Sequence, residues 1–362
     1  MHGVLKWMGL VLLVLWVPAD IFGGEAINLK TSRHWQMGGR VQLQHLYNPN
    51  IAADESKTTQ GFRMRRGRFW VKAKLTDWIH ARIQLSIRDA RVRILDLYTT
   101  FRLFDSYYLK IGQAKVPVWR EELRSSGKLL LVERSAVAQF LLDYQLSGWQ
   151  IGVEFGKTFT NGATLALSYT NGSGMNVRED AGRSKSDFVN NGKLYVARIT
   201  LPVGNILSLG VSGVYNQVGY YVKNIQDNRG AIVAIIPDFN LRLGSGVELE
   251  GGLVSGSVSK AFTGATNDER FFLADVSGRW TKTLGQPNPA LAGMDAVEIA
   301  AGVTYMNPNP SSGFLKKMVF RTGPAVYFGK NARLQLNIEY EQPDDDNLDA
   351  TMLLRTQVTV NF

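Results

Sequence analysis

Polar and apolar residues alternate with a period of two along most of this chain. In the stretch Phe62–Leu75, Arg66 and Arg68 share one face with two lysines, whereas Phe69 and Val71 lie on the other face. The next stretch, residues 79–88, repeats this pattern. Because a β-strand points successive side chains to opposite faces, we predict strands with one polar or cationic face and one apolar face.

Sixteen such stretches follow one another. Their predicted ranges are 38–47, 62–75, 79–88, 94–104, 107–115, 148–157, 162–170, 193–201, 206–217, 230–242, 245–258, 270–281, 294–306, 316–328, 332–341 and 351–362. The even number, with alternating short and long connections, predicts an all-β transmembrane antiparallel β-barrel whose short turns face the periplasm. Arg63 and Arg65 are out of phase with the rest of their strand, which predicts a β-bulge near its start.

The chain begins with the pattern of a secretory signal peptide. Lys6 precedes the apolar run Trp7–Val17, and small residues follow; the run is too short to favour a membrane anchor. We therefore predict a signal peptide (1–26), a short periplasmic N-terminal segment (27–37) and the barrel (38–362). Removing the signal takes away one lysine and two acidic residues, so the net charge of +10 becomes +11. The absence of cysteine excludes disulfides, thiolate metal sites and c-type haem attachment.

The last strand carries an independent indication of the same fold. Leu354, Val358, Val360 and Phe362 fall on one face of residues 354–362, and polar residues fall on the other. A chain that ends on phenylalanine in this alternation resembles the assembly signal of outer-membrane barrels, so Phe362 is expected to meet the assembly machinery. The predicted location is the outer membrane of a Gram-negative bacterium, surrounded by lipid and lipopolysaccharide.

Residues 116–147 interrupt the strands. Pro117 ends the preceding strand because proline cannot donate to a β-ladder. Charged residues then surround the adjacent hydroxyls of Ser125 and Ser126, and four aliphatic residues follow in Leu129–Val132. A solvated loop rarely holds four aliphatic residues in a row. We therefore predict that this third extracellular loop folds into the lumen and constricts the pore.

Four stretches resemble the phosphate-selective porin O and P family, and the resemblance is densest in residues 38–155. They are GGRVQLQ at Gly38–Gln44, FRMRRGRF…DW at Phe62–Trp78, IGQAKVPVW…EELRSS…LLLVERS at Ile111–Ser135, and LLRTQVTVNF at Leu353–Phe362. The resemblance implies a sixteen-stranded homotrimeric barrel whose third loop narrows the pore. It also implies that wall arginines form a ladder that delivers small inorganic anions to the constriction.

The resemblance assigns roles to particular residues of this chain. The anion pathway would comprise Arg40, Arg65 and Arg66 by motif, and Arg68, Arg82 and Arg198 by strand placement. The constriction would comprise Asp96, Glu122, Ser125, Ser126 and Lys128, with Glu133 and Arg134 as a structural ion pair that holds the loop to the wall. Structural alternatives stay open: the two serines would cap a short helix, Asp96 would pair with a wall arginine, and some arginines would face lipopolysaccharide.

The sequence departs from the family at two positions in this loop. Phosphate-specific members carry lysines where this chain has Glu122 and Gly127, with Lys128 one place later. Two like charges 4 Å apart repel by about 1 kcal/mol in water and about 4 kcal/mol at an effective dielectric constant of 20. The predicted function is therefore passive diffusion of small anions, of phosphate or related oxyanions. The alternative is a general or weakly anion-preferring porin without a specific phosphate site.

Other functions fit the sequence less well. A barrel enzyme needs a nucleophile with a base, and the three histidines that would survive export form no convergent group. A sheath for a cytochrome would be a larger barrel. We therefore expect no enzyme activity, no catalytic residues, no metal or other cofactor, and no nucleic-acid partner.

Overall fold

The computed structural model describes residues 34–51, 58–88, 91–177, 192–219, 221–222, 226–288 and 293–362. The predicted signal peptide (1–26) lies outside the described residues, as do residues 27–33. Strand β1 begins at His34, four residues before the predicted start. The prediction of a separate periplasmic segment up to residue 37 is therefore wrong for residues 34–37, which pair with Val71–Lys74 of the next strand.

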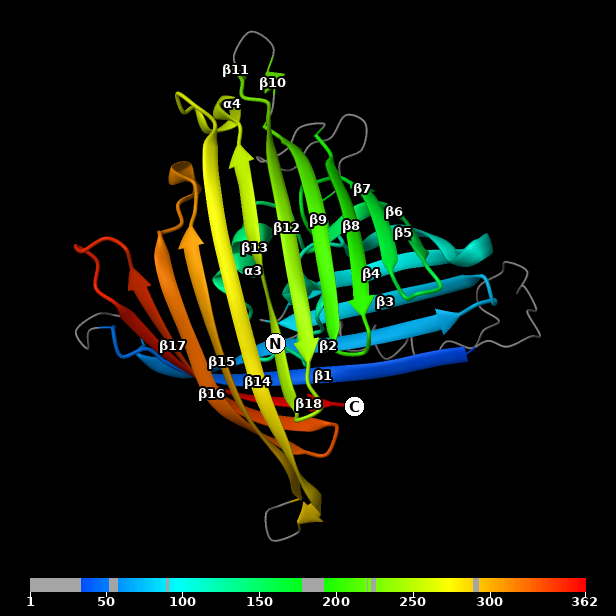
Figure 1. Ribbon diagram of the computed structural model, residues 1–362, viewed down its shortest axis with the longest axis vertical. Coiled ribbons are helices and arrows are strands. Elements are labelled where there is room, and N and C mark those ends of the chain that lie inside the picture. Colours follow the sequence, from blue (N-terminus) through cyan, green and yellow to red (C-terminus); the bar gives the residue numbers. More distant parts are fainter. Residues whose placement is uncertain are drawn as a thin grey trace, which may run out of the picture.

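Sixteen antiparallel strands form a closed barrel, as the sequence predicts (Figure 1). The strands of the barrel are β1 (His34–Tyr47), β2 (Gln60–Lys74), β3 (Ile79–Arg88), β4 (Arg91–Arg102), β5 (Tyr107–Lys115), β6 (Trp149–Thr158), β7 (Thr164–Thr170), β8 (Leu194–Val203), β9 (Leu207–Val218), β12 (Gly230–Arg242), β13 (Val247–Val258), β14 (Glu269–Asn288), β15 (Met294–Asn307), β16 (Lys317–Phe328), β17 (Ala332–Pro343) and β18 (Thr351–Asn361). Each strand pairs with its neighbours in sequence, and β1 closes the barrel against β18, with Arg40 opposite Asn361.

The remaining elements lie in the connections. They are η2 (Phe104–Ser106), α2 (Arg120–Leu123), α3 (Ala136–Asp143), the two-residue strands β10 (Tyr221–Val222) and β11 (Gln226–Asp227), α4 (Lys260–Thr263) and η4 (Pro310–Ser312). Within the described ranges, no helix has both the length and the apolar character needed to cross a membrane.

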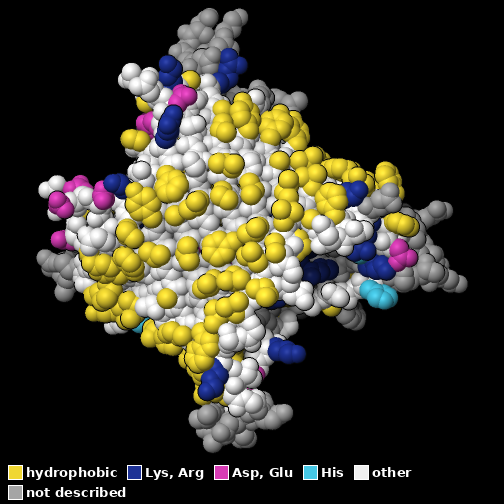
Figure 2. Space-filling view, viewed as in Figure 1, with side chains coloured by type: hydrophobic (Ala, Val, Ile, Leu, Met, Phe, Trp, Pro, Cys, Tyr) yellow, Lys and Arg dark blue, Asp and Glu magenta, His cyan; other side chains and the backbone are white. Residues whose placement is uncertain are grey.

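The two faces of the barrel wall differ in polarity. On β18, Val358 and Val360 are 41% and 40% exposed on the outside, whereas Gln357 and Thr359 are buried. Apolar side chains cover the visible outer face of the barrel (Figure 2). This alternation suits a wall that meets lipid outside and polar groups inside.

The predicted bulge lies at Arg65 in strand β2. Gln42 of β1 is opposite Arg66, but the next residue, Leu43, is opposite Met64, so Arg65 is the extra residue. A bulge changes the phase of the strand, which lets Arg63 and Arg66 point to the same side although they are three positions apart. Three basic residues within four positions, Arg63, Arg65 and Arg66, thus reach Glu133.

Part of the inner wall is apolar, which the sequence pattern did not predict. Strands β8–β15 contribute buried residues such as Ile232, Val254 and Leu273, and these pack against segment 116–147. From that segment, Phe140 of α3 stacks on Tyr144 and packs against Phe271 at a centroid distance of 5.1 Å. This core holds one side of the segment by burial of apolar surface.

Candidate functional site

Segment 116–147 contacts the first strand of the barrel through its serine pair. Arg40 of β1 donates hydrogen bonds from Nη1 to the hydroxyls of Ser125 (2.9 Å) and Ser126 (3.2 Å). A Cβ atom on Gly127 would lie 2.4 Å from Cζ of Arg40, so the absence of a side chain at position 127 lets this guanidinium approach. The wall thus supplies a cation beside Gly127 and the serine pair.

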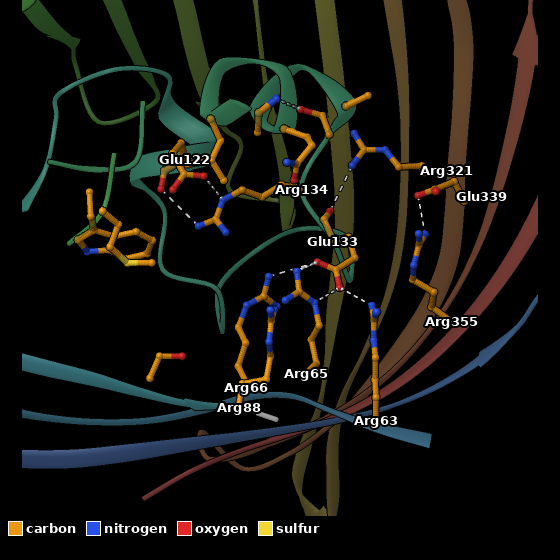
Figure 3. A pocket seen from close by; sticks show the side chains of 18 of the residues that line it. Arg63, Arg65, Arg66, Arg88, Glu122, Glu133, Arg134, Arg321, Glu339 and Arg355 are labelled. Carbon is orange, nitrogen blue, oxygen red and sulfur yellow. Dashed lines mark hydrogen bonds and ion pairs between the residues drawn. The ribbon is translucent and has the colours of Figure 1, made fainter. Parts of the chain in front are cut away.

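A cluster of arginines from β2 holds the segment at Glu133 (Figure 3). Arg65 bonds both carboxylate oxygens of Glu133, Arg66 donates to Oε2 at 3.2 Å, and Arg63 lies 3.6 Å from Oε1. Burial raises the pKa of Glu133, but the hydrogen bonds and charges of these arginines outweigh it and hold the pKa below its usual range. Glu133 therefore stays ionised and binds the segment to arginines of the wall, and the predicted ion pair between Glu133 and Arg134 is wrong, because Arg134 pairs with Glu122.

The backbone of Leu129–Val132 is hydrogen-bonded to side chains of β17, the strand next to β18. Arg333 of β17 donates to the carbonyl oxygens of Leu129 (2.8 Å) and Leu130 (3.1 Å), and Asn337 accepts from the amide of Val132 at 2.5 Å. Residues Leu129–Val132 are 1–3% exposed. These hydrogen bonds satisfy backbone groups that burial would otherwise leave unpaired.

Glu122 lies between two cations instead of presenting a free negative charge. Its carboxylate is 2.8 Å from Nζ of Lys115 and 2.8 Å from Nε of Arg134, and the residue is 3% exposed. Burial raises the pKa of Glu122, but the neighbouring Arg134 and Lys115 outweigh it and lower the pKa below its ordinary value. The charge of Glu122 is thus compensated within the protein.

Glu121 has the opposite environment. It accepts hydrogen bonds from the amide (2.9 Å) and the hydroxyl (2.5 Å) of Ser135, the N-cap of α3, and it lies near Asp275 and Arg321. Burial and the charge of Asp275 raise the pKa of Glu121 despite Arg321. This carboxyl therefore takes up a proton more readily than an ordinary glutamate.

A large cavity of about 890 Å³ lies at the end of the barrel that carries the long connections. Among its lining residues are eleven basic and four acidic side chains. One side consists of arginines from β2, β3 and β4, and another consists of Leu142, Trp149, Met175 and Phe314. The predicted residues Arg65, Arg66, Arg68 and Glu122 all line this cavity, but Asp96 and Arg82 do not.

A small cavity of about 460 Å³ lies on the other side of segment 116–147. Its charged lining residues are Arg120, Arg124, Lys128, Arg198 and Arg242, without a carboxylate, and Ser125 and Thr200 add hydroxyls. The predicted residues Ser125, Lys128 and Arg198 therefore line the same cavity. Glu122 lines the large cavity and Leu123 lines the small one, so the segment separates the two.

Other predicted residues form pairs within the wall. Arg82 donates to Asp96 at 2.5 Å, and Asp96 also accepts from the indole of Trp149 at 2.7 Å. This ion pair matches the structural alternative for Asp96. Arg198 forms a bidentate pair with Asp238, at 2.7 and 2.8 Å. The other structural alternative is wrong for the serines, because no helix begins at Ser125 or Ser126.

A set of inward acids and two arginines that contact the segment were not predicted from the sequence. The acids are Asp238, Glu248, Glu250, Asp275 and Glu298, and the arginines are Arg321 and Arg333. Their signal was the same alternation: Glu248 and Glu250 are buried, and Leu249 between them faces the other side. Arg124 of the segment pairs with both Glu248 (2.7 Å) and Glu250 (2.6 Å).

The barrel is similar to solved porins at low sequence identity. An anion-selective porin from Comamonas acidovorans aligns with a TM-score of 0.61 and 10% identity over 91% of this chain and 100% of that chain. The trimer form of OmpT, an outer membrane protein of Vibrio cholerae, gives 0.59 and 8% over 92% and 100%. The outer membrane channel DcaP of Acinetobacter baumannii gives 0.61 and 11% over 91% and 98%. These likenesses show the fold.

Comparison with curated proteins gave no match. The sequence model of a family described as phosphate-selective porin O and P matches residues 36–228. This match covers more than half of the chain and includes β1–β9 and segment 116–147. The chain therefore belongs to the phosphate-selective porin O and P family.

Proposed function

We propose that this protein is an outer-membrane porin through which small anions diffuse passively, and that phosphate or a related oxyanion binds weakly on the way. Segment 116–147 lies in the lumen in this proposal and forms the constriction. Family membership and the porin-like barrel support a passive channel, and porins are not enzymes. The likeness to an anion-selective porin supports the selectivity.

The observation that carries the proposal is the bond from Arg40 to the serine pair. Because each hydroxyl accepts from the guanidinium, its own O–H can donate to a third group. A partly dehydrated oxyanion in the small cavity would gain the donor of Ser125, which lines that cavity, whereas Ser126 is 3% exposed and Arg40 lies behind the pair. Arginine suits such a site because it stays charged and presents a planar fork of donors to oxyanions.

The charge of the small cavity supports the same path. Five basic side chains and no carboxylate line it, so it concentrates anions next to Ser125. Asp238 lies behind two of the five, Arg120 and Arg198, and pairs with both. Such partial compensation keeps binding weak enough for an ion to leave, which conduction requires.

Glu122 no longer argues against an oxyanion at the constriction. Its carboxylate is buried and in contact with Lys115 and Arg134, so a permeating ion would meet a neutralised group. The remaining distinction is between a channel that binds phosphate and a porin that merely prefers anions.

Reversal potential and conductance in planar bilayers test the proposal. A potassium chloride gradient should give an anion-selective reversal potential, and millimolar phosphate should reduce the chloride current. The control variant Arg102→Gln should leave the block by phosphate unchanged, because Arg102 lines neither cavity. A cation-selective potential would refute the anion channel. Anion selectivity without any block by phosphate would establish the alternative, a weakly anion-preferring porin.

The remaining expectations belong to the same proposal. Export through the signal peptide 1–26, a homotrimer, contacts with lipopolysaccharide and assembly through Phe362 follow from the family resemblance. The carbonyl of Phe362 accepts from the amide of Gly39 at 2.7 Å, and the side chain is 73% exposed. Cross-linking of the folded protein in outer-membrane fractions would test the trimer, and a monomer would contradict it.

A further inference from the structure

The large cavity differs from a simple vestibule for inorganic ions because its walls are of two kinds. Arginines from β2–β4 form one wall. Leu142 of α3, Trp149, Met175 and Phe314 supply apolar surface to the same cavity. A hydrated inorganic ion gains no binding energy from contact with apolar surface. Ligand sites of about 300–1,000 Å³ that combine apolar lining with a few polar groups usually hold organic molecules.

Arg68 is the group that most clearly lacks a partner in this cavity. Among the described residues, its guanidinium has no hydrogen-bond or ion-pair partner, and its Nε is buried without one. Its Cζ lies 5.7 Å from the ring centroid of Trp149, a cation–π contact. Its neighbours Arg65 and Arg66 differ, because both already bind Glu133.

Trp149 is itself held in place. Its indole N–H donates to Asp96 at 2.7 Å, and Nζ of Lys115 lies 4.5 Å from its ring centroid. Arg68 and Trp149 therefore form a preorganised pair on the wall of the cavity that Leu142, Met175 and Phe314 also line. The terminal nitrogens of this guanidinium have no partner among the described residues, so an anion that reaches them gains a charge-assisted hydrogen bond.

We propose that the large cavity binds organic anions that carry an anionic head and an apolar body. The head pairs with Arg68, and the body covers Leu142 and Phe314 beside Trp149. This inference rests on the proposed anion channel only in that the ligand arrives along the same basic wall. It adds a ligand class that inorganic phosphate does not represent.

Two phosphate esters separate the apolar contribution from the charge. Methyl phosphate and phenyl phosphate are both dianions at pH 8, and only the second has an apolar ring. Each is added to the side of the bilayer that faces the large cavity, and the reduction of the chloride current is measured. Burial of the ring should lower the half-blocking concentration of phenyl phosphate about tenfold relative to methyl phosphate.

Three variants test the assignment of the two walls. Arg68→Gln should raise the half-blocking concentration of both esters, and Leu142→Ser should raise that of phenyl phosphate alone. Leu142 is 36% exposed on α3, so this variant keeps the test open if Arg68→Gln does not fold. Arg102→Gln removes one positive charge away from the cavity and should change neither value.

The outcomes separate this inference from the proposed function. Equal block by the two esters in an anion-selective channel would overturn the organic-anion site and leave the channel intact. A preference for phenyl phosphate that Leu142→Ser does not reduce would also overturn it, because the apolar wall would then have no part. A cation-selective reversal potential with preserved phenyl phosphate block would refute the channel proposal and support the site.

Discussion

Arg40 of β1 and Ser125 of segment 116–147 are joined by a hydrogen bond of 2.9 Å, although 85 residues separate them in sequence. The guanidinium passes over Gly127, where a Cβ atom would lie 2.4 Å from Cζ of Arg40. The donor that orients the serine hydroxyls therefore comes from the wall, and the segment supplies the space for it.

Substituting Arg40→Gln should weaken block of the chloride current by phosphate about ten- to a hundredfold, because a charge-assisted hydrogen bond contributes about 1.5–3 kcal/mol. Arg40→Lys should lose less, since it keeps the charge but not the planar fork. Titration of the single-channel current with phosphate measures both. Unchanged block in Arg40→Gln, with normal folding, would contradict a role for Arg40 at the constriction.

Substituting Glu122→Lys should destabilise the segment and should not strengthen phosphate binding. Three cations would then meet in a buried site, and breaking a buried ion pair typically costs about 3–5 kcal/mol. Unfolding in urea, followed by gel mobility of the folded barrel, measures the loss. Glu341→Lys, at the more exposed ion pair with Lys317, is the control and should cost much less. A stable Glu122→Lys variant with tighter phosphate block would show that the carboxylate faces the ion.

Substituting Glu133→Gln should raise the single-channel conductance, because the segment loses its charged contacts with β2. The depressed pKa of Glu133 sets the pH dependence. A lowered carboxyl pKa gives stability that is present above the ordinary value of about 4.3 and is lost as pH falls through the folded value. Wild-type conductance should therefore stay constant from pH 7 to about 4.5. A rise in conductance within that pH range would contradict the conclusion that Glu133 stays ionised and holds the segment to β2.

Substituting Glu121→Gln should stabilise the barrel at pH 7. The pKa of Glu121 is raised, so its protonated form fits the folded state, and stability is lost as pH rises through the folded value. Glutamine imitates that form and should also flatten the increase in stability that the wild type shows on acidification from pH 7 to 5. Urea midpoints at several pH values measure both effects. A glutamine variant less stable than wild type at pH 7 would show that the negative charge is needed there.

The fold could be predicted from sequence because alternation is a local property. Each strand shows its two faces in about ten consecutive residues, and the break at Arg65 marks the bulge that the register confirms. Strand β1 begins four residues before the predicted start because His34–Met37 continue its alternation, with Trp35 and Met37 on the same outward face as Val41.

The interior of the barrel could be predicted only in part, because its contacts are long-range. Glu122 meets Lys115 and Arg134 only after segment 116–147 has folded, so neither partner could be inferred from alternation. The apolar residues of β8–β15 broke the expected polar inner face, and their purpose depends on α3, which packs against them. The residue types along the strands predicted a basic channel. The ion pairs that neutralise its charge could be identified only from the structure.

Segment 116–147 also contacts strands on both sides of the place where the barrel closes. It bonds Arg40 on the first strand, and Arg333 and Asn337 on the strand next to the last one. These contacts lie on both sides of the β1–β18 pairing that closes the barrel. A piece from the middle of the sequence therefore cross-links the strands on either side of the barrel's closure, and loss of these contacts would loosen both the closure and the position of the segment.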